Sequence, residues 1–435
     1  MAHLSAASSP AVPMEMQTRQ LDTGNADLWW IRPHTFVLFI LLPLFLLLPL
    51  LPPPPKDVKT YFGTEMYLLG IGLLVLFGIG SWLGACGIDR FRRRPASSLH
   101  LRVLLLDLLF LMTFAAYVTW FLEILLNPAL LLQAAQFGAF EVRGQVSNIP
   151  GITSFTQAGI PFFICYFVAT RYCGQKLGFR FHIYIAILLA LAMVRTFIWA
   201  ERLALLEIVI PVLLLSIPTW RSRSRSLRGG LIAAPLFGIA ALIVFFGVME
   251  YFRSWLDFYA ESEESFPNFI LQRISNYYVT AVNNAVGYLV ENGDWPRWDG
   301  RYVLSGIYAI PGISEALVTE FALRPDTFSA FLSNYLDDEF NNFSGLYFPI
   351  VDFGLIVGPL VLAAYALLTG YCWRLFALQS IGGLLFYPLV YVGLIDLLRV
   401  MYLGNSRSVI PVALLTIIYF VGFRRRVSKQ QVYSI

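Results

Sequence analysis

The sequence predicts an all-α, polytopic integral membrane protein with about ten transmembrane helices and one long extracytoplasmic loop that contains short helices. Hydrophobic residues make up 58% of its 435 positions and charged residues only 13%, too few for the surface of an ordinary soluble globule. The apolar runs approach the roughly 20 residues that a helix needs to cross about 30 Å of hydrocarbon. They also lack the alternating pattern of a membrane β-barrel.

Ten apolar runs are the candidate spans. They lie near residues 35–51, 61–83, 103–124, 151–169, 183–199, 203–219, 231–249, 347–370, 380–398 and 408–422. The fifth and sixth form one continuous run, which we divide at Ala200-Glu201-Arg202 because the whole is too long for a single span even when tilted. The predicted organisation is an N-terminal tail (1–34), seven helices (35–249), a large loop (250–346), three helices (347–422) and a C-terminal tail (423–435).

Basic residues gather in alternate loops, which predicts the orientation of these helices. More than half of the 31 Lys and Arg residues follow the second, fourth, sixth, eighth and tenth spans. Loops rich in Lys and Arg face the cytoplasm. Both termini are therefore predicted to be cytoplasmic and the 250–346 loop to lie outside. The net charge of +4 is a signal of topology and does not indicate nucleic-acid binding.

The large loop is rich in acidic, amide and aromatic side chains. Its residues Trp295 and Trp298 lie among turn residues, and such rings are suited to stacking on the apolar faces of sugars. The alternative is that the rings belong to an interfacial aromatic belt. Residues 268–290 have apolar side chains at helical spacing, which predicts a helix on or dipping into the membrane surface.

Charged residues inside or beside the apolar runs are candidate functional residues, because a charge at mid-bilayer costs roughly 2.5–3.5 kcal/mol. Arg195, Glu201 and Arg202 lie at the outer ends of the fifth and sixth spans. They would either bind a substrate or lock this hairpin through salt bridges. Arg143 is the one base of the 125–150 loop and would bind an anion or snorkel to the interface. Arg399 and Arg407 flank the last outer loop and would join such a site or be solvated.

The predicted outer face is rich in arginine and poor in lysine, which favours a polyphosphate ligand. Only Lys56 and Lys59 lie on that face. Guanidinium groups bind phosphate oxygens in a forked geometry and stay charged when partly desolvated. We expect the arginines to surround an outward-facing cavity that a membrane-embedded anion enters from the side.

A motif at the start of the eighth span resembles the signature of Wzy-type oligosaccharide repeat-unit polymerases. Its residues are Glu339, Asn341, Asn342, Tyr347, Asp352, Phe353, Gly354 and Gly358. The family's usual aromatic-Thr pair is Phe343-Ser344 here, and the asparagine is doubled. The stretch around Arg202 and the stretch from Arg143 to Gly151 also resemble arginine-bearing segments of that family.

The resemblance implies block transfer of a growing glycan from undecaprenyl diphosphate to the nonreducing hydroxyl of a new lipid-linked repeat unit. The protein would work at the periplasmic face of the bacterial inner membrane, in the lipid bilayer, without cofactor or metal, and with a chain-length regulator protein as a further partner. All four histidines fall on the predicted cytoplasmic side. The general base would then be Asp352, Glu201 or Glu339, although Asp352 at a helix start is equally suited to a capping role.

In this reading, the arginines Arg143 and Arg202 stabilise the leaving diphosphate. The expected substrate-binding residues are Arg195, Asn341, Asn342, Trp295, Trp298 and Tyr347. Two other classes stay open. An O-antigen ligase-like transferase would resemble this layout but carry an outward histidine, and a lipid-linked oligosaccharide flippase would spread charges over many spans and have short outer loops.

Overall fold

The computed structural model is mostly helical. It describes residues 28–52, 58–87, 94–127, 129–130, 132–133, 149, 151–199, 201–221, 230–259, 265–293, 295–320, 327–336 and 340–425. The statements below concern these residues.

Five helical segments are long and apolar enough to cross a membrane. They are Pro33–Leu50, α3 (Thr64–Cys86), α4 (Val103–Trp120), α9 (Arg180–Ile198) and α17 (Phe348–Ala377). Three apolar helices are shorter, namely α12 (Ala234–Glu250), α18 (Ile381–Ile395) and α19 (Ser406–Val421). Such helices indicate a multi-pass membrane protein. The number of ten spans stays a prediction.

Each of the ten predicted runs contains helix, and several of the helices are irregular. Pro33–Leu50 is built from α1 (Pro33–Phe36), a π-helix (Val37–Leu41), α2 (Leu42–Leu47) and a 3-10 turn (Leu48–Leu50). The fourth run is a 3-10 helix (Thr153–Ala158), α8 (Gly159–Phe167) and a π-helix (Val168–Tyr172). The sixth run is α10 (Arg202–Arg221), and α5 (Leu122–Leu126) follows α4. The predicted break between the fifth and sixth runs is confirmed, because α9 ends at Ile198 and α10 begins at Arg202.

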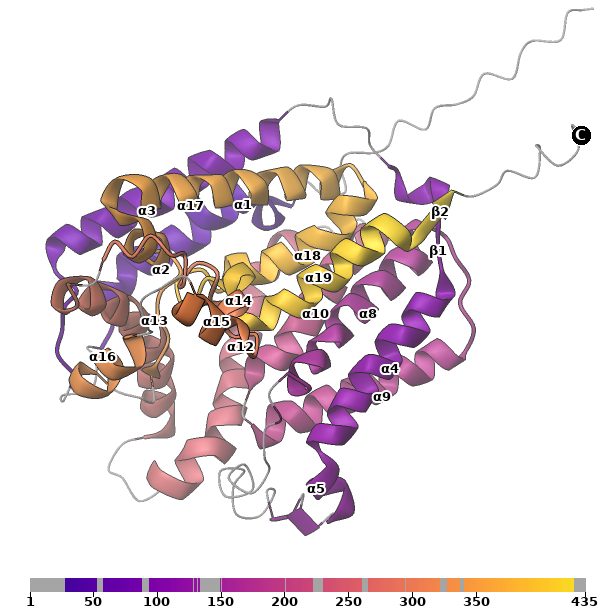
Figure 1. Ribbon diagram of the computed structural model, residues 1–435, viewed down its shortest axis with the longest axis horizontal. Helices are drawn as coiled ribbons and strands as arrows, with labels where there is room; N and C mark the ends of the chain where they lie inside the picture. The colour runs from indigo at the N-terminus through magenta and orange to yellow at the C-terminus, as the bar shows by residue number, and fades with distance from the viewer. Residues whose placement is uncertain are drawn as a thin grey trace, which may run out of the picture.

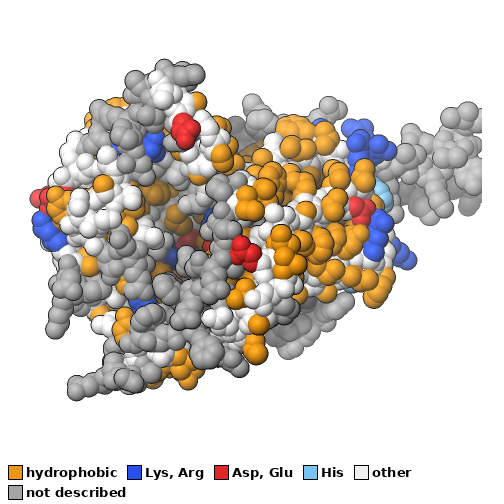
Figure 2. Space-filling view, turned by 60° about the horizontal axis from the view of Figure 1, so that its bottom comes forward, with side chains coloured by type: hydrophobic (Ala, Val, Ile, Leu, Met, Phe, Trp, Pro, Cys, Tyr) orange, Lys and Arg blue, Asp and Glu red, His pale blue; other side chains and the backbone are white. Residues whose placement is uncertain are grey.

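The helix bundle has two different ends (Figure 1). At one end lie α13 (Phe266–Glu291), α14 (Ser305–Tyr308), α15 (Ile313–Glu320) and α16 (Phe328–Tyr335). At the other end β1 (Leu99–Leu101) pairs antiparallel with β2 (Phe423–Arg425), a small sheet that the all-α prediction did not include. Figure 2 shows a broad apolar surface with basic side chains gathered toward the β-sheet end. The orientation predicted from the basic loops stays a prediction.

The helix expected at 268–290 is confirmed as α13, but it lies inside the protein rather than on a membrane surface. Most of its residues are buried. Its amides tie neighbouring segments together, since Asn283 Nδ2 donates to the carbonyl of Lys59 at 2.9 Å and Asn284 Nδ2 donates to that of Phe340 at 2.7 Å. A π-helix (Tyr251–Tyr259) leads from α12 toward α13. The short helices expected in this loop are α14, α15 and α16.

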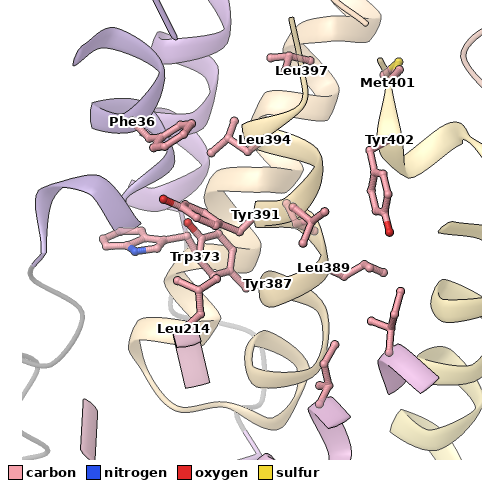
Figure 3. Packing of buried hydrophobic residues seen from close by; sticks show 14 of the residues in the cluster. Phe36, Leu214, Trp373, Tyr387, Leu389, Tyr391, Leu394, Leu397, Met401 and Tyr402 are labelled. Atoms are coloured by element: carbon pink, nitrogen blue, oxygen red, sulfur yellow. The ribbon is translucent and has the colours of Figure 1, made fainter. Parts of the chain in front are cut away.

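Helix α18 is the centre of the bundle. It is apolar on all sides and buried along nearly its whole length, as expected for a helix surrounded by other helices. Figure 3 shows Tyr387 and Tyr391 of α18 lying close to Trp373 of α17 and Phe36 of α1. The Tyr391 hydroxyl donates to the carbonyl of Trp30 at 2.7 Å. The N-terminal helix is thus fixed to the centre of the bundle.

Helices α3 and α17 run side by side in close contact (Figure 1), because glycines line the seam between them. A Cβ on Gly84 of α3 would collide with the backbone carbonyl of Leu367, and a Cβ on Gly370 of α17 with that of Ser81. Within a membrane, small residues allow the close van der Waals packing that holds helices together.

The seam predicts a position-specific effect of valine on stability. Gly84→Val should lower the melting temperature of the detergent-purified protein, because overpacking costs about 1–3 kcal/mol. Gly72→Val in the same helix is the matched control, since a Cβ there meets no atom within 4 Å. Equal melting temperatures for the two variants would contradict the close α3–α17 packing.

Candidate functional site

Charged side chains from five helices and two connecting segments meet at the α13 end of the bundle, and we call this group the charge cluster. Its guanidinium groups belong to Arg195, Arg202, Arg273, Arg399 and Arg407, and its carboxylates to Glu201, Glu207, Glu250 and Asp396. Figure 2 shows a hollow between the polar end and the apolar helices, with acidic and basic side chains visible inside it. The arginine-lined cavity that the sequence predicts would lie in this region.

The first half of the charge cluster joins the α9–α10 turn to α19. Glu201 Oε2 accepts from Arg195 Nε at 2.9 Å and from Arg407 Nη1 at 3.2 Å. The other nitrogens of Arg407 form a fork with Glu207, with both N–O distances 2.9 Å. Arg195 is buried, with Nη1 donating to Thr156 Oγ1 at 2.9 Å. Arg407 is therefore paired with acids rather than solvated.

The second half of the charge cluster joins α10, α12 and α13. Arg202 is the first residue of α10, where the positive end of the helix dipole opposes a positive side chain. Its Nη2 donates to Glu250 Oε1 and also lies 3.2 Å from the Tyr277 hydroxyl. Glu250 is fully buried and is shared with Arg273, whose Nε lies 3.3 Å from Oε2. If Arg202 serves as a structural salt-bridge residue, the acid that it pairs with is Glu250 rather than the adjacent Glu201.

Tyr277 links the second half to the loop after α18. Its ring centroid lies 5.1 Å from the guanidinium carbon of Arg202 and 5.1 Å from that of Arg399. Arg399 Nη1 donates to Asp396 Oδ1 at 3.2 Å. The Tyr402 hydroxyl, from the same loop, donates to Glu207 Oε1 at 2.8 Å. These contacts make the charge cluster one connected network.

The charge cluster contains one more guanidinium than carboxylate among the described residues. Breaking a buried ion pair leaves an uncompensated charge and costs about 3–5 kcal/mol. The acids therefore hold the arginines in place. Burial alone would raise the pKa of Glu201, but Arg195 and Arg407 outweigh it and hold that pKa below its ordinary value. Glu201 is consequently a weak base.

Asp352 is a buried carboxylate that binds backbone N–H groups of a neighbouring segment. It lies in the first turns of α17, fully buried, just before a break at Gly354, whose φ of 76° favours glycine. Its Oδ2 accepts from the backbone N–H of Tyr302 at 3.0 Å and of Val303 at 2.7 Å. Its own carbonyl accepts from the Trp298 N–H at 2.7 Å. The carboxylate thus anchors the 295–303 segment through backbone donors, a structural role other than the predicted cap of its own helix. Its role as general base stays a prediction.

The predicted aromatic ligands differ in exposure. Trp298 is 62% exposed and its ring lies 6.2 Å from that of Phe353, so one face of the segment offers an open aromatic ring. Trp295 is half-buried and its Nε1 donates to the carbonyl of Leu289 at 2.7 Å. Tyr347 is fully buried and its hydroxyl donates to the carbonyl of Met66 at 2.8 Å. Tyr347 is therefore engaged in packing in this structure, and its role as a substrate ligand stays a prediction.

Two further predicted residues, Asn341 and Asn342, make no hydrogen bond or ion pair with the charge cluster among the described residues. Asn341 is exposed and Asn342 half-buried, and the carbonyl of Asn342 accepts from Asn284 Nδ2 at 2.9 Å. Arg143 and Glu339 lie outside the described residues.

Sequence reasoning overlooked Glu250, Arg273 and Asp396. Glu250 and Asp396 each end an apolar run, in "FFGVMEYF" and "VGLIDLLR", and Arg273 interrupts the apolar face of α13. A charge in such a setting is the same signal that marked Arg195 and Arg202 as candidates.

A separate cavity of about 500 Å³ lies away from these charges. It is lined by Tyr166, Phe167, Thr170, Arg171, His182 and Ile185.

Comparison with protein-family models, with curated proteins and with solved structures finds no match to this chain. The functional argument therefore depends on the residues of the chain.

The anchoring role of Asp352 predicts a local change in hydrogen exchange. Asp352→Asn should speed exchange of the Tyr302 and Val303 amides by on the order of 10–100-fold, because a hydrogen bond to a charged group contributes about 1.5–3 kcal/mol. Glu291→Gln, which removes an exposed partner of Lys59, is the control. Unchanged exchange together with lost activity would instead assign Asp352 to the chemistry.

Proposed function

We propose that this protein is a membrane glycosyltransferase of the Wzy type, which polymerises undecaprenyl-diphosphate-linked oligosaccharide repeat units into a long polysaccharide. The α13 end would face the periplasm, and both termini the cytoplasm. The observation that carries the proposal is the charge cluster, whose five guanidinium groups lie at the boundary between apolar helices and a polar end. A lipid diphosphate has its anionic group at that depth, attached to a hydrocarbon chain that stays in the bilayer.

The reaction requires little beyond positioning and charge stabilisation. The hydroxyl of the acceptor sugar attacks C1 of the donor glycan, and the bond from C1 to the phosphate oxygen breaks. The electron pair leaves on the diphosphate, where guanidinium groups stabilise the developing charge. Arg202 is half-buried beside Tyr277 and Phe246, so its charge is only partly screened by solvent. Arg195 and Arg407 would act from the other half of the cluster.

The exposed ring of Trp298 supports the glycan part of the proposal. It lies in the 295–303 segment, which Asp352 fixes to the start of α17. A rigid aromatic ring offers a stacking surface for a sugar at low cost in conformational entropy. The segment would hold the repeat unit while the charge cluster holds the diphosphate.

The function is tested in the native strain by deleting the gene and restoring it in variant forms. Arg202→Ala should reduce long polymer on a gel and retain the single repeat unit, with a rate loss on the order of 10²–10³. Arg202→Lys should restore little, because an ammonium cannot form the fork. Lys59→Ala is the control, since its salt bridge to Glu291 is exposed. Protein abundance is measured on the same samples by immunoblot.

Three outcomes separate the alternatives. Loss of every repeat unit from the surface, rather than of long polymer alone, would indicate a ligase or a flippase. Full polymer from Arg202→Ala at normal abundance would remove Arg202 from the site. Restored polymer in the double variant Arg202→Glu, Glu250→Arg would reduce the pair to a structural salt bridge.

A further inference from the structure

Asp396 differs from the other carboxylates of the charge cluster in having an oxygen without a partner. It follows the end of α18 and is 6% exposed. Its Oδ1 accepts from Arg399 Nη1 at 3.2 Å, whereas Oδ2 is buried and has no hydrogen-bond partner among the described residues. An unsatisfied buried acceptor is costly, and such groups occur where a ligand or a reaction uses them.

Among the described residues, the other carboxylates of the charge cluster and Asp352 are occupied. Both oxygens of Glu207 accept from the Arg407 fork, and both oxygens of Glu250 are bound by arginines. Asp352 is held by backbone N–H groups. Glu201 is shared by two guanidinium groups, which lower its basicity. Asp396 is therefore the described carboxylate best placed to accept a new hydrogen bond.

The surroundings of Asp396 combine both charge signs with phenolic hydroxyls. Arg399 pairs with it from its own loop, and Glu207 of α10 and Arg407 of α19 lie close enough to interact with it electrostatically. Tyr278 of α13 and Tyr402 lie close enough to interact with it electrostatically. Arg399 Nε is also buried without a partner among the described residues. An unpartnered acceptor and an unpartnered donor thus belong to one ion pair.

We propose that Asp396 is the general base that takes the proton from the acceptor hydroxyl, an inference that rests on the proposed polymerase function. The acceptor oxygen forms its bond to C1 of the donor, the bond from C1 to the phosphate oxygen breaks, and the proton of the hydroxyl moves to Asp396 Oδ2. The lipid diphosphate leaves with the electron pair. No further reactant is required.

Arg399 acts as a positioning residue in this arrangement. It holds Asp396 through Nη1, its Nε has no partner among the described residues, and its side chain is 27% exposed. A diphosphate bound by Arg399 would bring the leaving group and the base to the same guanidinium. Arg399 also packs on Tyr277, which contacts Arg202, so the ion pair of Asp396 and Arg399 is connected to the second half of the charge cluster.

The test uses the full-length protein in nanodiscs, with lipid-linked repeat unit as both donor and acceptor. Asp396→Asn should lower the rate of chain extension on the order of 10²–10⁴-fold, the usual effect of removing a general base. Its affinity for the lipid-linked repeat unit should stay within about twofold of wild type, because the arginines remain. Glu291→Gln, also a carboxylate of the α13 end, should extend chains at the wild-type rate.

Formate provides a second measurement that does not depend on the stability of one variant. It should raise the rate of Asp396→Ala several-fold and leave that of wild type and of Arg202→Ala unchanged, since only the first lacks the base. An Asp396→Asn rate near wild type, or an Asp396→Ala rate that formate does not change, would overturn the assignment. If wild type itself extends no chains, the polymerase proposal fails and this inference with it. If wild type is active and the Asp396 variants behave like it, the inference alone fails.

Discussion

The pairing of arginines with buried acids at the α13 end is the interaction on which the arrangement of the bundle depends. Unpaired charges at this depth would each cost several kcal/mol. Glu201 and Glu207 hold Arg407 of α19 against the α9–α10 turn, and Glu250 holds Arg202 against α12 and α13. The helices must meet here for the charges to be neutralised, and the same requirement places several guanidinium groups around one region.

The 295–303 segment likewise depends on a buried acid that satisfies its polar groups. Its backbone donors need a buried acceptor, and Asp352 supplies one from the start of α17. The break at Gly354 lets the chain leave this short turn and continue as the long apolar helix beside α3. Substrate recognition in the proposed function thus depends on a carboxylate that is itself structural. The charge cluster and the 295–303 segment would act as two parts of one site.

The sequence was informative where a physical signal is local. Apolar length located the helices, and the charged break at Glu201-Arg202 separated α9 from α10. Partners were not predictable, because the acid that neutralises Arg202 is Glu250, which lies 48 positions away along the chain. For the same reason Tyr347 was assigned to a substrate site although its hydroxyl meets Met66 of α3. The 268–290 pattern predicted the helix but not its burial, since amphipathicity does not tell a protein surface from a membrane surface.

The central claim is that the guanidinium groups of the charge cluster bind a lipid diphosphate, and equilibrium binding tests it most directly. Undecaprenyl diphosphate is titrated into the purified protein in nanodiscs, with phosphatidylglycerol as the reference anionic lipid. A site built on the charge cluster predicts saturable binding of one lipid per chain, weakened about 10-fold or more by Arg202→Ala, the loss expected for one charge-assisted hydrogen bond. Lys59→Ala should bind as wild type does. Binding no stronger than that of phosphatidylglycerol, or equal in Arg202→Ala and wild type, would contradict the claim.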